Sequence, residues 1–554
     1  MTKAKWEVVP TSESTVKRLE YGLGISRITA RVLAARGIAD ETEAKSFLEP
    51  RLDDLSDPTA LPDADASLER LIDAVTNDDH VMVIGHDDVD GITASAIIFG
   101  ALKQVGTDVS YYIPDSPTEG IGLSRKIVDR FKKIGVSLIV TVDCGVSNAA
   151  GVAYARSLGI DTIVTDHHEP PDELPEAVGV IDAKRKDSDY GFRDLAGCGV
   201  AFRFMEAFAE RYRRIGTPPS LDGMLGMAAL GSFADRVPLT DENRIIVSHG
   251  IREVLNKRSV PFATLRSHIW VDESSTMTEV LSKIVPIVGA SRAHEGGNLG
   301  CELLLATEPE DAEEIMSSLV MEAEHKREKA RRALDKVMER LSGRDLESPR
   351  ALVAVVGHLP NKTVGYCTSR LAEQLNKPVI LISQKGELGN GEARGPKGVD
   401  LVEALRAHKD YFLDYGGHKQ AAGFSIEESK IGELSDKLAA YLEDRVDRSV
   451  IQRKIIIDSK LGYDELTAEG LRSLLCLEPF GEDNRRPVFL LESLRPSVIK
   501  EIDGTWKMAE IVLTGDALAS GQDWSGDGRL SLVVSPFGDG NTRALEVIDW
   551  KLTR

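Results

Sequence analysis

Three short clusters of acidic residues and histidines stand out in the first half of the chain. They are His86-Asp87-Asp88-Val89-Asp90, then Asp143-Cys144-Gly145, then Asp166-His167-His168. Carboxylate and imidazole groups together suit Mn²⁺ and Mg²⁺, and imidazole favours Mn²⁺ over Mg²⁺. Two such ions about 3.5–4 Å apart can generate hydroxide from water and stabilise an in-line displacement at phosphorus. These residue types therefore predict a two-metal site for phosphoryl chemistry.

Each cluster directly follows a short apolar segment that is typical of a buried strand. The three segments are HVMVIG, SLIVTV and DTIVT, and helical patterns such as ITASAIIFGALKQVG lie between them. Strands that alternate with helices predict right-handed crossovers and a parallel sheet. Because loops at the carboxyl ends of parallel strands converge, the three clusters should meet in space. A single Asp after a strand is usually a helix N-cap, but capping does not account for three clusters in register.

The spacing of apolar residues divides the rest of the chain into further parts. The first 75 residues have helical spacing, and residues 309–342 predict one or two long exposed helices. From about 350 a second α/β pattern begins, and from about 453 five short apolar segments predict a small OB-like barrel. We therefore predict an α/β protein with two lobes joined by a long helix, followed by a β-barrel. The predicted divisions are 1–75 (helical segment), 76–250 (catalytic domain), 251–345 (helical connector), 346–445 (substrate-binding domain) and 446–554 (OB-fold).

The composition limits the class of protein further. The chain has 554 residues and a formal net charge of −21, which argues against a uniformly basic surface for nucleic acid but not against a local basic groove. Five cysteines without a C-x-x-C pair indicate neither a disulfide framework nor a zinc ribbon. No apolar run approaches the ~20 residues of a membrane span, and the start lacks an apolar signal core. We therefore expect a cytoplasmic protein.

Taken together, the motifs resemble the DHH phosphoesterase superfamily and, within it, the RecJ family of single-strand-specific 5′→3′ exonucleases. The resemblance runs nearly end to end. It includes DVDGITA, VDCGVSN, TDHHEP, LAGCGVAFRF, LGSFADRVPLTDENR, YGGHKQAAGFSI and LEPFGEDNRRPVF. The triple acidic motif is typical of the superfamily, whereas LEPFG with the β-rich tail is specific to the RecJ branch.

The resemblance implies a role for individual residues. The implied metal ligands are His86, Asp88, Asp90, Asp143, His167 and Asp235. Asp143 would bridge two ions, Mn²⁺ or Mg²⁺, and His168 would lie beside the scissile phosphate, so that His168, Asp143 and Asp235 form the catalytic set. The implied substrate-binding residues are Arg292, Arg394, Gly416, Gly417 and His418. Without the family, Gly416 and Gly417 would also fit a plain tight turn.

Several substrate-side positions depart from the family pattern. Ser116 stands where the family has Arg, Ile121 where it has Tyr, and Asp182-Ala183 where it has Asn-Pro. His86 stands where RecJ proteins usually have Asp. Since the metal ligands are intact, these departures bear on strand preference, end recognition and processivity more than on hydrolysis.

The resemblance implies a metal-dependent exonuclease that releases 5′-mononucleotides from single-stranded DNA in repair and recombination. RNA stays open as a substrate, because nothing in the sequence senses a 2′-hydroxyl. Two alternatives remain: an oligoribonuclease or cyclic-dinucleotide phosphodiesterase, and a replisome factor that binds GINS. We expect a monomer, with a single-strand-binding protein, a helicase or GINS as partners. Trp506, Phe489 and Phe537 are candidate stacking platforms in the barrel, although barrel aromatics are more often core.

Overall fold

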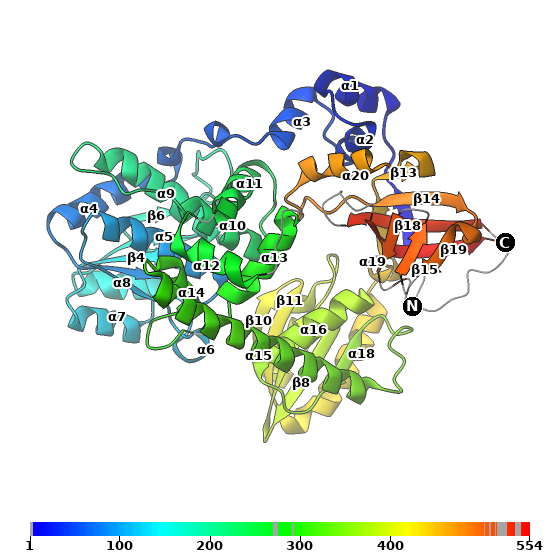
Figure 1. Cartoon of the computed structure of the whole chain (residues 1–554). Helices are drawn as coiled ribbons and strands as arrows, with labels where there is room; N and C mark the ends of the chain where they lie inside the picture. Colours follow the sequence, from blue (N-terminus) through cyan, green and yellow to red (C-terminus); the bar gives the residue numbers. More distant parts are fainter. Residues whose placement is uncertain are drawn as a thin grey trace. The chain divides into compact units, whose positions relative to one another are not determined.

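The chain folds into two compact units in the computed structural model (Figure 1). The described residues are 4–256, 258–269, 275–290, 293–502, 505–508, 511–515, 517, 529–537 and 544–553. The larger unit comprises Val9–Ala323 and Asp458–Arg554. The smaller unit comprises Met1–Val8 and Glu324–Ile457. Each unit is described separately below.

A five-stranded parallel sheet organises the first part of the larger unit. Its strand order is β3-β2-β4-β5-β6. The strands are β2 (Val81–Ile84), β3 (Val109–Tyr112), β4 (Leu138–Val142), β5 (Asp161–Thr165) and β6 (Gly179–Ile181). All residues of β2 and β4 are buried, as expected for a parallel sheet with both faces covered. The predicted parallel sheet is therefore confirmed.

Alternate residues along each strand contribute to two separate cores. Val81 and Val83 face a core with α4 (Ala64–Thr76), α5 (Val89–Gln104) and α9 (Gly197–Tyr212). Met82 and Ile84 face a core with α7 (Arg125–Lys133) and α8 (Ala149–Ser157). Because side chains alternate across a strand, helices cover both faces and leave the carboxyl ends of the strands for the site.

A layer of helices extends this region beyond the sheet. It contains α10 (Met224–Ala234), α11 (Asp241–Asn256), α12 (Val260–His268), α13 (Met277–Val288) and α14 (Leu299–Leu305). α10 packs against α5, α9 and α11. This packing brings the C-terminal end of α10, with Asp235, to the same edge of the sheet as the three clusters.

The C-terminal region forms a seven-stranded sheet of order β13-β14-β18-β19-β17-β16-β15. The strands are β13 (Ser459–Leu461), β14 (Phe489–Leu494), β15 (Ile499–Ile502), β16 (Thr505–Met508), β17 (Ile511–Thr514), β18 (Arg529–Phe537) and β19 (Ala544–Thr553). The predicted OB-like β-region is confirmed. Phe489 is wholly buried, so it is a core residue and not a stacking platform. Trp506 is partly buried against the same core, and the side chain of Phe537 lies outside the described residues.

The N-terminal helices share their hydrophobic core with this C-terminal sheet. α1 (Glu13–Leu23), α2 (Arg27–Ala35) and α3 (Glu41–Leu48) contribute Leu19 and Leu33, among others, to a cluster that includes Leu474 and Phe489. These segments are more than 400 residues apart in sequence, so nothing in their local pattern indicates the pairing.

A buried arginine ties the helical layer to the segment before β14. Arg244 of α11 donates hydrogen bonds to the carbonyl oxygens of Phe47 (2.7 Å), Leu477 (3.2 Å) and Glu478 (2.8 Å). Glu478 in turn accepts a hydrogen bond from the backbone N–H of Met277 (2.7 Å), at the start of α13. The LEPFG motif is thus a junction between helices and barrel within the larger unit.

The smaller unit contains a second, mixed sheet of order β10-β11-β9-β8-β7. Its strands are β7 (Leu352–Val355), β8 (Val379–Lys385), β9 (Leu388–Arg394), β10 (Phe412–His418) and β11 (Ala421–Glu427). β7 and β8 are parallel around α16 (Asn361–Leu375), as predicted, and the other pairs are antiparallel. The long helix α15 (Pro309–Leu341) leads into this unit, and α17 (Leu401–Arg406) and α18 (Ile431–Arg445) cover the other face.

A two-stranded sheet also belongs to the smaller unit. β1 (Lys5–Val8) pairs in parallel with β12 (Lys454–Ile457). The prediction of a helical start is therefore wrong for residues 5–8, because this strand is stabilised by a partner that is remote in sequence. Among the described residues, no helix combines the length and apolar character needed to cross a membrane.

Candidate metal centre

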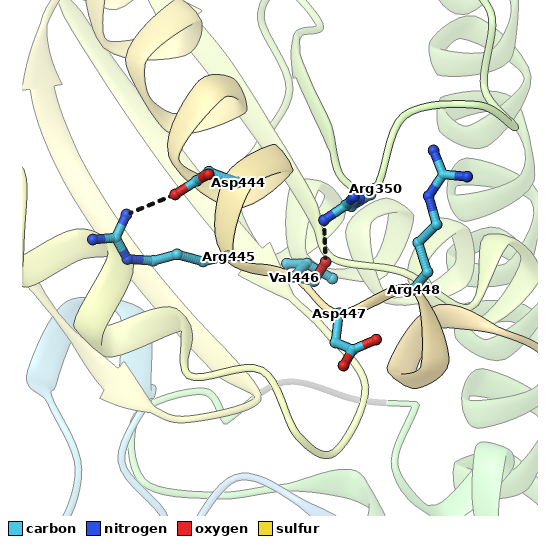
Figure 2. Close-up of a pocket in the computed structure, with 6 residues that line it drawn as sticks. All are labelled: Arg350, Asp444, Arg445, Val446, Asp447 and Arg448. Carbon is cyan, nitrogen blue, oxygen red and sulfur yellow. Dashed lines mark hydrogen bonds and ion pairs between the residues drawn. The ribbon is translucent and has the colours of Figure 1, made fainter.

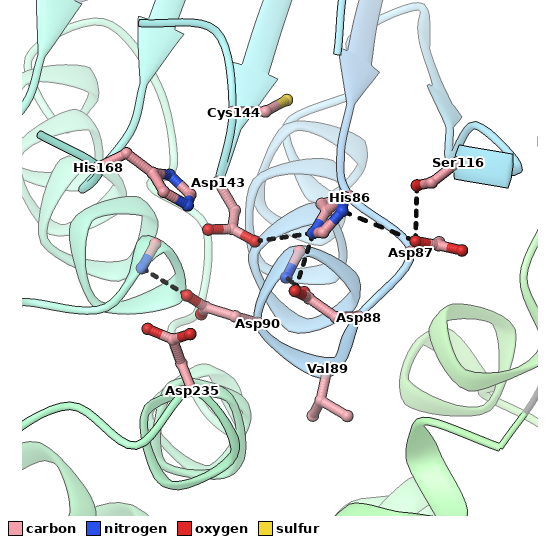
Figure 3. Close-up of polar contacts among 12 residues, drawn as sticks. His86, Asp87, Asp88, Val89, Asp90, Ser116, Asp143, Cys144, His168 and Asp235 are labelled. Atoms are coloured by element: carbon pink, nitrogen blue, oxygen red, sulfur yellow. Dashed lines mark hydrogen bonds and ion pairs between the residues drawn. The ribbon is translucent and has the colours of Figure 1, made fainter. Parts of the chain in front are cut away.

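The three clusters lie together at the carboxyl ends of β2, β4 and β5 (Figure 3). Potential ligand atoms within 4.8 Å of one another form three groups. The groups are His86-Asp88-Asp143, Asp143-His167-His168 and Asp90-His167-Asp235. Because Asp143 and His167 each belong to two groups, the groups are continuous, and the predicted convergence is confirmed.

The loop after β2 holds His86 and Asp88 in contact. The Nδ1 of His86 is hydrogen-bonded to Asp88 Oδ2 at 2.8 Å, while Asp88 Oδ1 accepts the backbone N–H of Gly91 at 2.9 Å and caps α5. A Cβ at Gly91 would lie 2.6 Å from the backbone nitrogen and oxygen of His86, so the turn requires glycine. Burial disfavours the imidazolium, but the hydrogen bond to Asp88 and the nearby carboxylates outweigh it and raise the pKa of His86.

Asp143 lies between two histidines. Its Oδ1 is 3.1 Å from His167 Nε2, and its Oδ2 is 3.8 Å from His86 Nδ1. Its backbone adopts a left-handed conformation (φ 56°), which is uncommon for a non-glycine residue and typical of functional sites. Burial raises its pKa well above the usual value, and the charges of Asp90 and Asp88 add to this effect. This placement suits a carboxylate that bridges two cations.

Asp90 is held by the N-terminus of α9. Its Oδ2 accepts the backbone N–H of Gly197 at 2.7 Å, and its Oδ1 accepts that of Cys198 at 2.8 Å. The positive end of a 16-residue helix thus stabilises a buried carboxylate. A Cβ at Gly231 of α10 would lie 2.9 Å from Asp90 Oδ1, so a glycine on this second helix also makes room for the carboxylate. Residues of the LAGCGVAF and LGSFAD motifs therefore position the same carboxylate, that of Asp90.

Asp166 orients the third cluster. This carboxylate is buried and accepts the backbone N–H groups of Val146 (2.9 Å), His167 (2.8 Å) and His168 (3.2 Å), and also the Nδ1–H of His168 (2.7 Å). The last bond raises the pKa of His168. The sequence motif drew attention to Asp166 but did not assign it this role. The sequence feature that indicates this residue is its place as the first member of the Asp-His-His run.

Asp235 closes the site from the end of α10. Its Oδ2 is 3.7 Å from His167 Nε2, and burial raises its pKa to about 7, with the charges of Asp90 and Asp88 acting in the same direction. It is the downstream residue that the family resemblance implies, and the structure brings it to the other predicted ligands.

Two polar groups near the site were not singled out as functional by the sequence. Asp182, after β6, is wholly buried, and burial raises its pKa to about 7. Its Oδ1 accepts the backbone N–H of Lys184 at 2.8 Å, while its Oδ2 has no partner among the described residues. Asp87 accepts a hydrogen bond from Ser116 Oγ at 2.7 Å (Figure 3). The signal for Asp182 was its departure from the family pattern, whereas Asp87 stood in the first acidic cluster and its partner Ser116 departs from the family pattern.

The donor set fits divalent cations. Asp88, Asp90, Asp143 and Asp235 bring hard oxygen ligands together. His167 Nε2 lies 3.1–3.7 Å from carboxylate oxygens of Asp90, Asp143 and Asp235. Their mutual repulsion, which raises the pKa of Asp143 and Asp235 beyond the effect of burial, is the repulsion that bound cations relieve. The oxygen ligands suit both Mn²⁺ and Mg²⁺, and the imidazoles favour Mn²⁺ over Mg²⁺.

The predicted substrate-binding residues of the smaller unit lie on one sheet. Arg394 pairs with Ala421, and Ala421 pairs with His418, so Arg394 and His418 occupy one row and the same face. Gly416 and Gly417 lie within β10, so the tight-turn alternative is wrong. Gly417 has φ 133°, and a Cβ there would lie 2.4 Å from the carbonyl oxygen of Ala421. Arg292 lies outside the described residues.

A separate pocket of about 440 Å³ lies where α18 ends (Figure 2). Arg350, Arg445 and Arg448 line it together with Asp444, Val446 and Asp447. Arg350 donates to the carbonyl oxygen of Val446 at 3.1 Å, and Arg445 pairs with Asp444 at 3.7 Å. Since two of the three guanidinium groups are engaged within the unit, we assign this pocket no ligand.

Comparisons with known proteins agree with this fold and site. The DHH family, N-terminal domain, matches residues 80–235, and the DHHA1 domain matches residues 348–444. The fold and the site therefore define a DHH phosphoesterase. The single-stranded-DNA-specific exonuclease RecJ of Thermus thermophilus is 31% identical over 487 residues, which cover 84% of this chain and 69% of that protein. The chain belongs to the RecJ family, as the motifs predicted.

Other relatives support the same assignment. RecJ of Bacillus subtilis is 29% identical over 495 residues, and the matched part covers 89% of this chain and 62% of that longer protein. RecJ of Salmonella typhimurium is 29% identical over 528 residues, which cover 92% and 87% of the two chains. The structure of Thermus thermophilus RecJ with Mn²⁺ matches with a TM-score of 0.81 at 24% identity, over 99% of this chain and 79% of that chain. The predicted two-lobed fold with a barrel is confirmed.

Proposed function

We propose that the protein is a metal-dependent exonuclease that hydrolyses single-stranded DNA from the 5′ end and releases 5′-mononucleotides, in DNA repair and recombination. The observation that carries this proposal is the convergence of three donor groups at one edge of the parallel sheet. RecJ relatives whose names specify single-stranded DNA support the choice of substrate.

We assign His86, Asp88, Asp90, Asp143, His167 and Asp235 as ligands of two Mn²⁺ or Mg²⁺ ions. RecJ structures in complex with Mn²⁺ and with Mg²⁺ support the choice of metal. When bound, such ions supply Lewis-acid stabilisation of the phosphate and lower the pKa of water. Asp143 has one oxygen toward each histidine, which suits the bridging position, and Asp235 completes the second group.

His168 is the residue we place beside the scissile phosphate. Its side chain is 59% exposed, in contrast to the buried His167, so it is accessible to a substrate. Because its Nδ1–H is held by Asp166, its Nε2 is the nitrogen left for the substrate. The raised pKa favours imidazolium, which can donate a hydrogen bond to a phosphate oxygen.

Roles for the other segments follow from the residues they carry. We propose that Arg394, Gly416, Gly417 and His418 bind a backbone phosphate in segment 346–445, and that Arg292 also contacts the substrate. Arg394 is oriented by Glu392 at 2.9 Å, and nothing lies within 4 Å of a Cβ built on Gly416, so this face is open to a ligand. We infer that segment 76–250 carries catalysis, segment 251–345 connects, and segment 446–554, braced by helices from segment 1–75, holds the strand.

We further propose that the protein acts as a monomer in the cytoplasm and works beside a single-strand-binding protein, a helicase or GINS. The names of the relatives specify single-stranded DNA, which a single-strand-binding protein also binds. Size-exclusion chromatography with each purified partner tests this part of the proposal.

End-labelled single-stranded and duplex DNA and RNA, incubated with Mn²⁺, Mg²⁺ or EDTA, test the activity. We expect mononucleotides from the 5′ end of single-stranded DNA, with no product in EDTA. Activity confined to dinucleotides would contradict the proposal and indicate a small-substrate phosphodiesterase. Strand binding without hydrolysis in either metal would indicate a binding factor.

A further inference from the structure

Lys184 lies on the loop that follows β6, beside the third metal-site cluster. The backbone N–H of Asp166 donates to the carbonyl oxygen of Ile181, the last residue of β6, at 3.0 Å. The loop therefore begins next to the Asp-His-His run and at the same edge of the sheet. Among the described residues, no carboxylate lies within ion-pair distance of Lys184 Nζ, and its side chain is only partly buried.

The residues on both sides of Lys184 are fixed by buried hydrogen bonds. Asp182 accepts the backbone N–H of Lys184, and Arg185 donates to the carbonyl oxygen of Val180 at 2.6 Å and to both oxygens of Asp187 at 3.0 and 2.7 Å. Arg193 also donates to the carbonyl oxygen of Lys184. The backbone that presents Lys184 is therefore preorganised, and its ammonium is the group that remains without a partner in the loop.

The charge of Lys184 acts on four groups at the site. Burial raises the pKa of Asp235 and of Asp182, and Lys184 opposes this rise. Burial lowers the pKa of His167, and the hydrogen bond to Asp166 raises that of His168; in both, Lys184 lowers the pKa. The affected groups follow β5, follow β6 or end α10. Because the ammonium of Lys184 acts on all of them, it lies close to the site that they form.

We propose that Lys184 binds a phosphate of the substrate at the metal centre, and this inference rests on the proposed nuclease function. A lysine is a compact positive charge that binds phosphate without the two-point geometry of arginine. Here its charge acts on the partly exposed His168 and on Asp235, where the substrate phosphate would enter between buried carboxylates and solvent. Lys184 is thereby a substrate-binding residue outside the predicted set.

The test compares Lys184→Gln with Lys184→Arg and with Lys186→Gln. Lys186 is on the same loop, but its side chain is 86% exposed and pairs with Asp172 at 2.9 Å, so it is a matched surface control. We expect Lys184→Gln to raise KM for single-stranded DNA about tenfold. The dependence of log KM on log salt should become shallower by about 0.7, the value for one fewer phosphate contact with a single strand. Lys184→Arg should retain most of the affinity, and Lys186→Gln should match the wild type.

Two further readouts separate binding from structure. Tm and Mn²⁺ affinity of Lys184→Gln should equal those of the wild type, and its Kd for a 5′-phosphorylated oligonucleotide, measured with Ca²⁺ by fluorescence anisotropy, should rise about tenfold. Equal KM, Kd and salt slope in Lys184→Gln and Lys186→Gln would overturn the inference. A loss of Tm or Mn²⁺ affinity without a change in Kd would also overturn it, since Lys184 would then only neutralise the acidic cluster. If the wild type cleaves no DNA, the proposed function fails, while the anisotropy comparison still decides the phosphate contact.

Discussion

Gly197, at the start of α9, offers a sharp test of how the metal centre is positioned. Its backbone N–H donates to Asp90 Oδ2 at 2.7 Å, and a Cβ on this residue would lie 2.7 Å from the Cβ of Asp143 and 2.8 Å from its Oδ1. Ordinary van der Waals contact of a Cβ begins near 3.4 Å, so Gly197→Ala forces a displacement of about 0.7 Å. Either α9 or Asp143 must move; α9 holds the proposed ligand Asp90 through its backbone N–H groups, and Asp143 is itself a proposed ligand.

The expected loss of stability on Gly197→Ala is the sum of three contributions to the free energy of unfolding. Forcing an extra methyl into a packed site costs about 1–3 kcal/mol. Weakening a hydrogen bond to a charged carboxylate costs about 1.5–3 kcal/mol. Replacing a helical glycine by alanine returns about 1 kcal/mol. The net loss of stability is roughly 1.5–5 kcal/mol, so we expect a fall in Tm of several degrees and a fall in Mn²⁺ affinity of about tenfold or more.

Gly199, on the same helix, provides the control. A Cβ there would lie 3.4 Å from Leu195 Cδ2 and 3.9 Å from Ile246 Cδ1, which are ordinary contacts. Gly199→Ala should therefore keep the wild-type Mn²⁺ affinity and keep or slightly raise Tm. Thermal unfolding with and without Mn²⁺, together with calorimetric titration of Mn²⁺, measures both quantities. Equal Mn²⁺ affinity in Gly197→Ala and Gly199→Ala would refute the argument that α9 positions Asp90 and Asp143.

Three further substitutions test other parts of the structure. Asp143→Asn should abolish Mn²⁺-dependent hydrolysis. It should also raise the Tm of the metal-free protein, because burial and repulsion by neighbouring carboxylates disfavour the charged form of Asp143 and raise its pKa. An unchanged Tm of the metal-free protein would count against this repulsion. Burial raises the pKa of Glu478 from 4.5 to about 7, so the native state favours its protonated form and loses on the order of 3 kcal/mol of stability as pH rises from 5 to 8. Glu478→Gln keeps an acceptor for the N–H of Met277 and should flatten the dependence of Tm on pH in this range; a slope equal to that of the wild type would contradict the assignment. Arg244→Met leaves four backbone carbonyls without their donor and should lower the free energy of unfolding by roughly 3 kcal/mol or more in urea titrations, whereas the exposed Arg252→Met should have little effect. Equal stability of the two variants would disprove the junction.

Most of the metal centre could be predicted from the sequence. His86, Asp88 and Asp90 follow one strand, and Asp143 and His167 follow two others, so the rule for parallel sheets was sufficient to bring them together. Asp235 could not be reached in this way, because it ends a helix and not a strand. It was identified only through the family resemblance.

The supporting residues could be identified only in the structure. Asp166 was visible as part of a motif, but its hydrogen bond to His168 depends on the backbone after β5. Gly197 lies in a motif without carboxylates or histidines, and its role appears only where α9 meets Asp143. Lys184 is one of many surface-type residues in the sequence, and the pairing of β5 with β6 is what places it beside the site.

Local patterns also failed where long-range pairing decides the structure. The predicted β7 and β8 are buried apolar runs, but β9 and β10 are rich in glycine and polar residues and form strands through their partners. The N-terminal helices are amphipathic, which indicates that a buried face exists but not that the C-terminal sheet covers it.

The sequence by itself determined the alternation of strands and helices, the residues that end each strand and hence the chemistry of the site, because periodicity and residue type act locally. The tertiary structure decided which remote segments complete that site. The start of α9 donates backbone N–H groups to Asp90, α10 brings Asp235, and the loop after β6 presents Lys184. The physical reason is that burial and the charges of neighbours set the state of each carboxylate, and both depend on contacts between residues far apart in the chain.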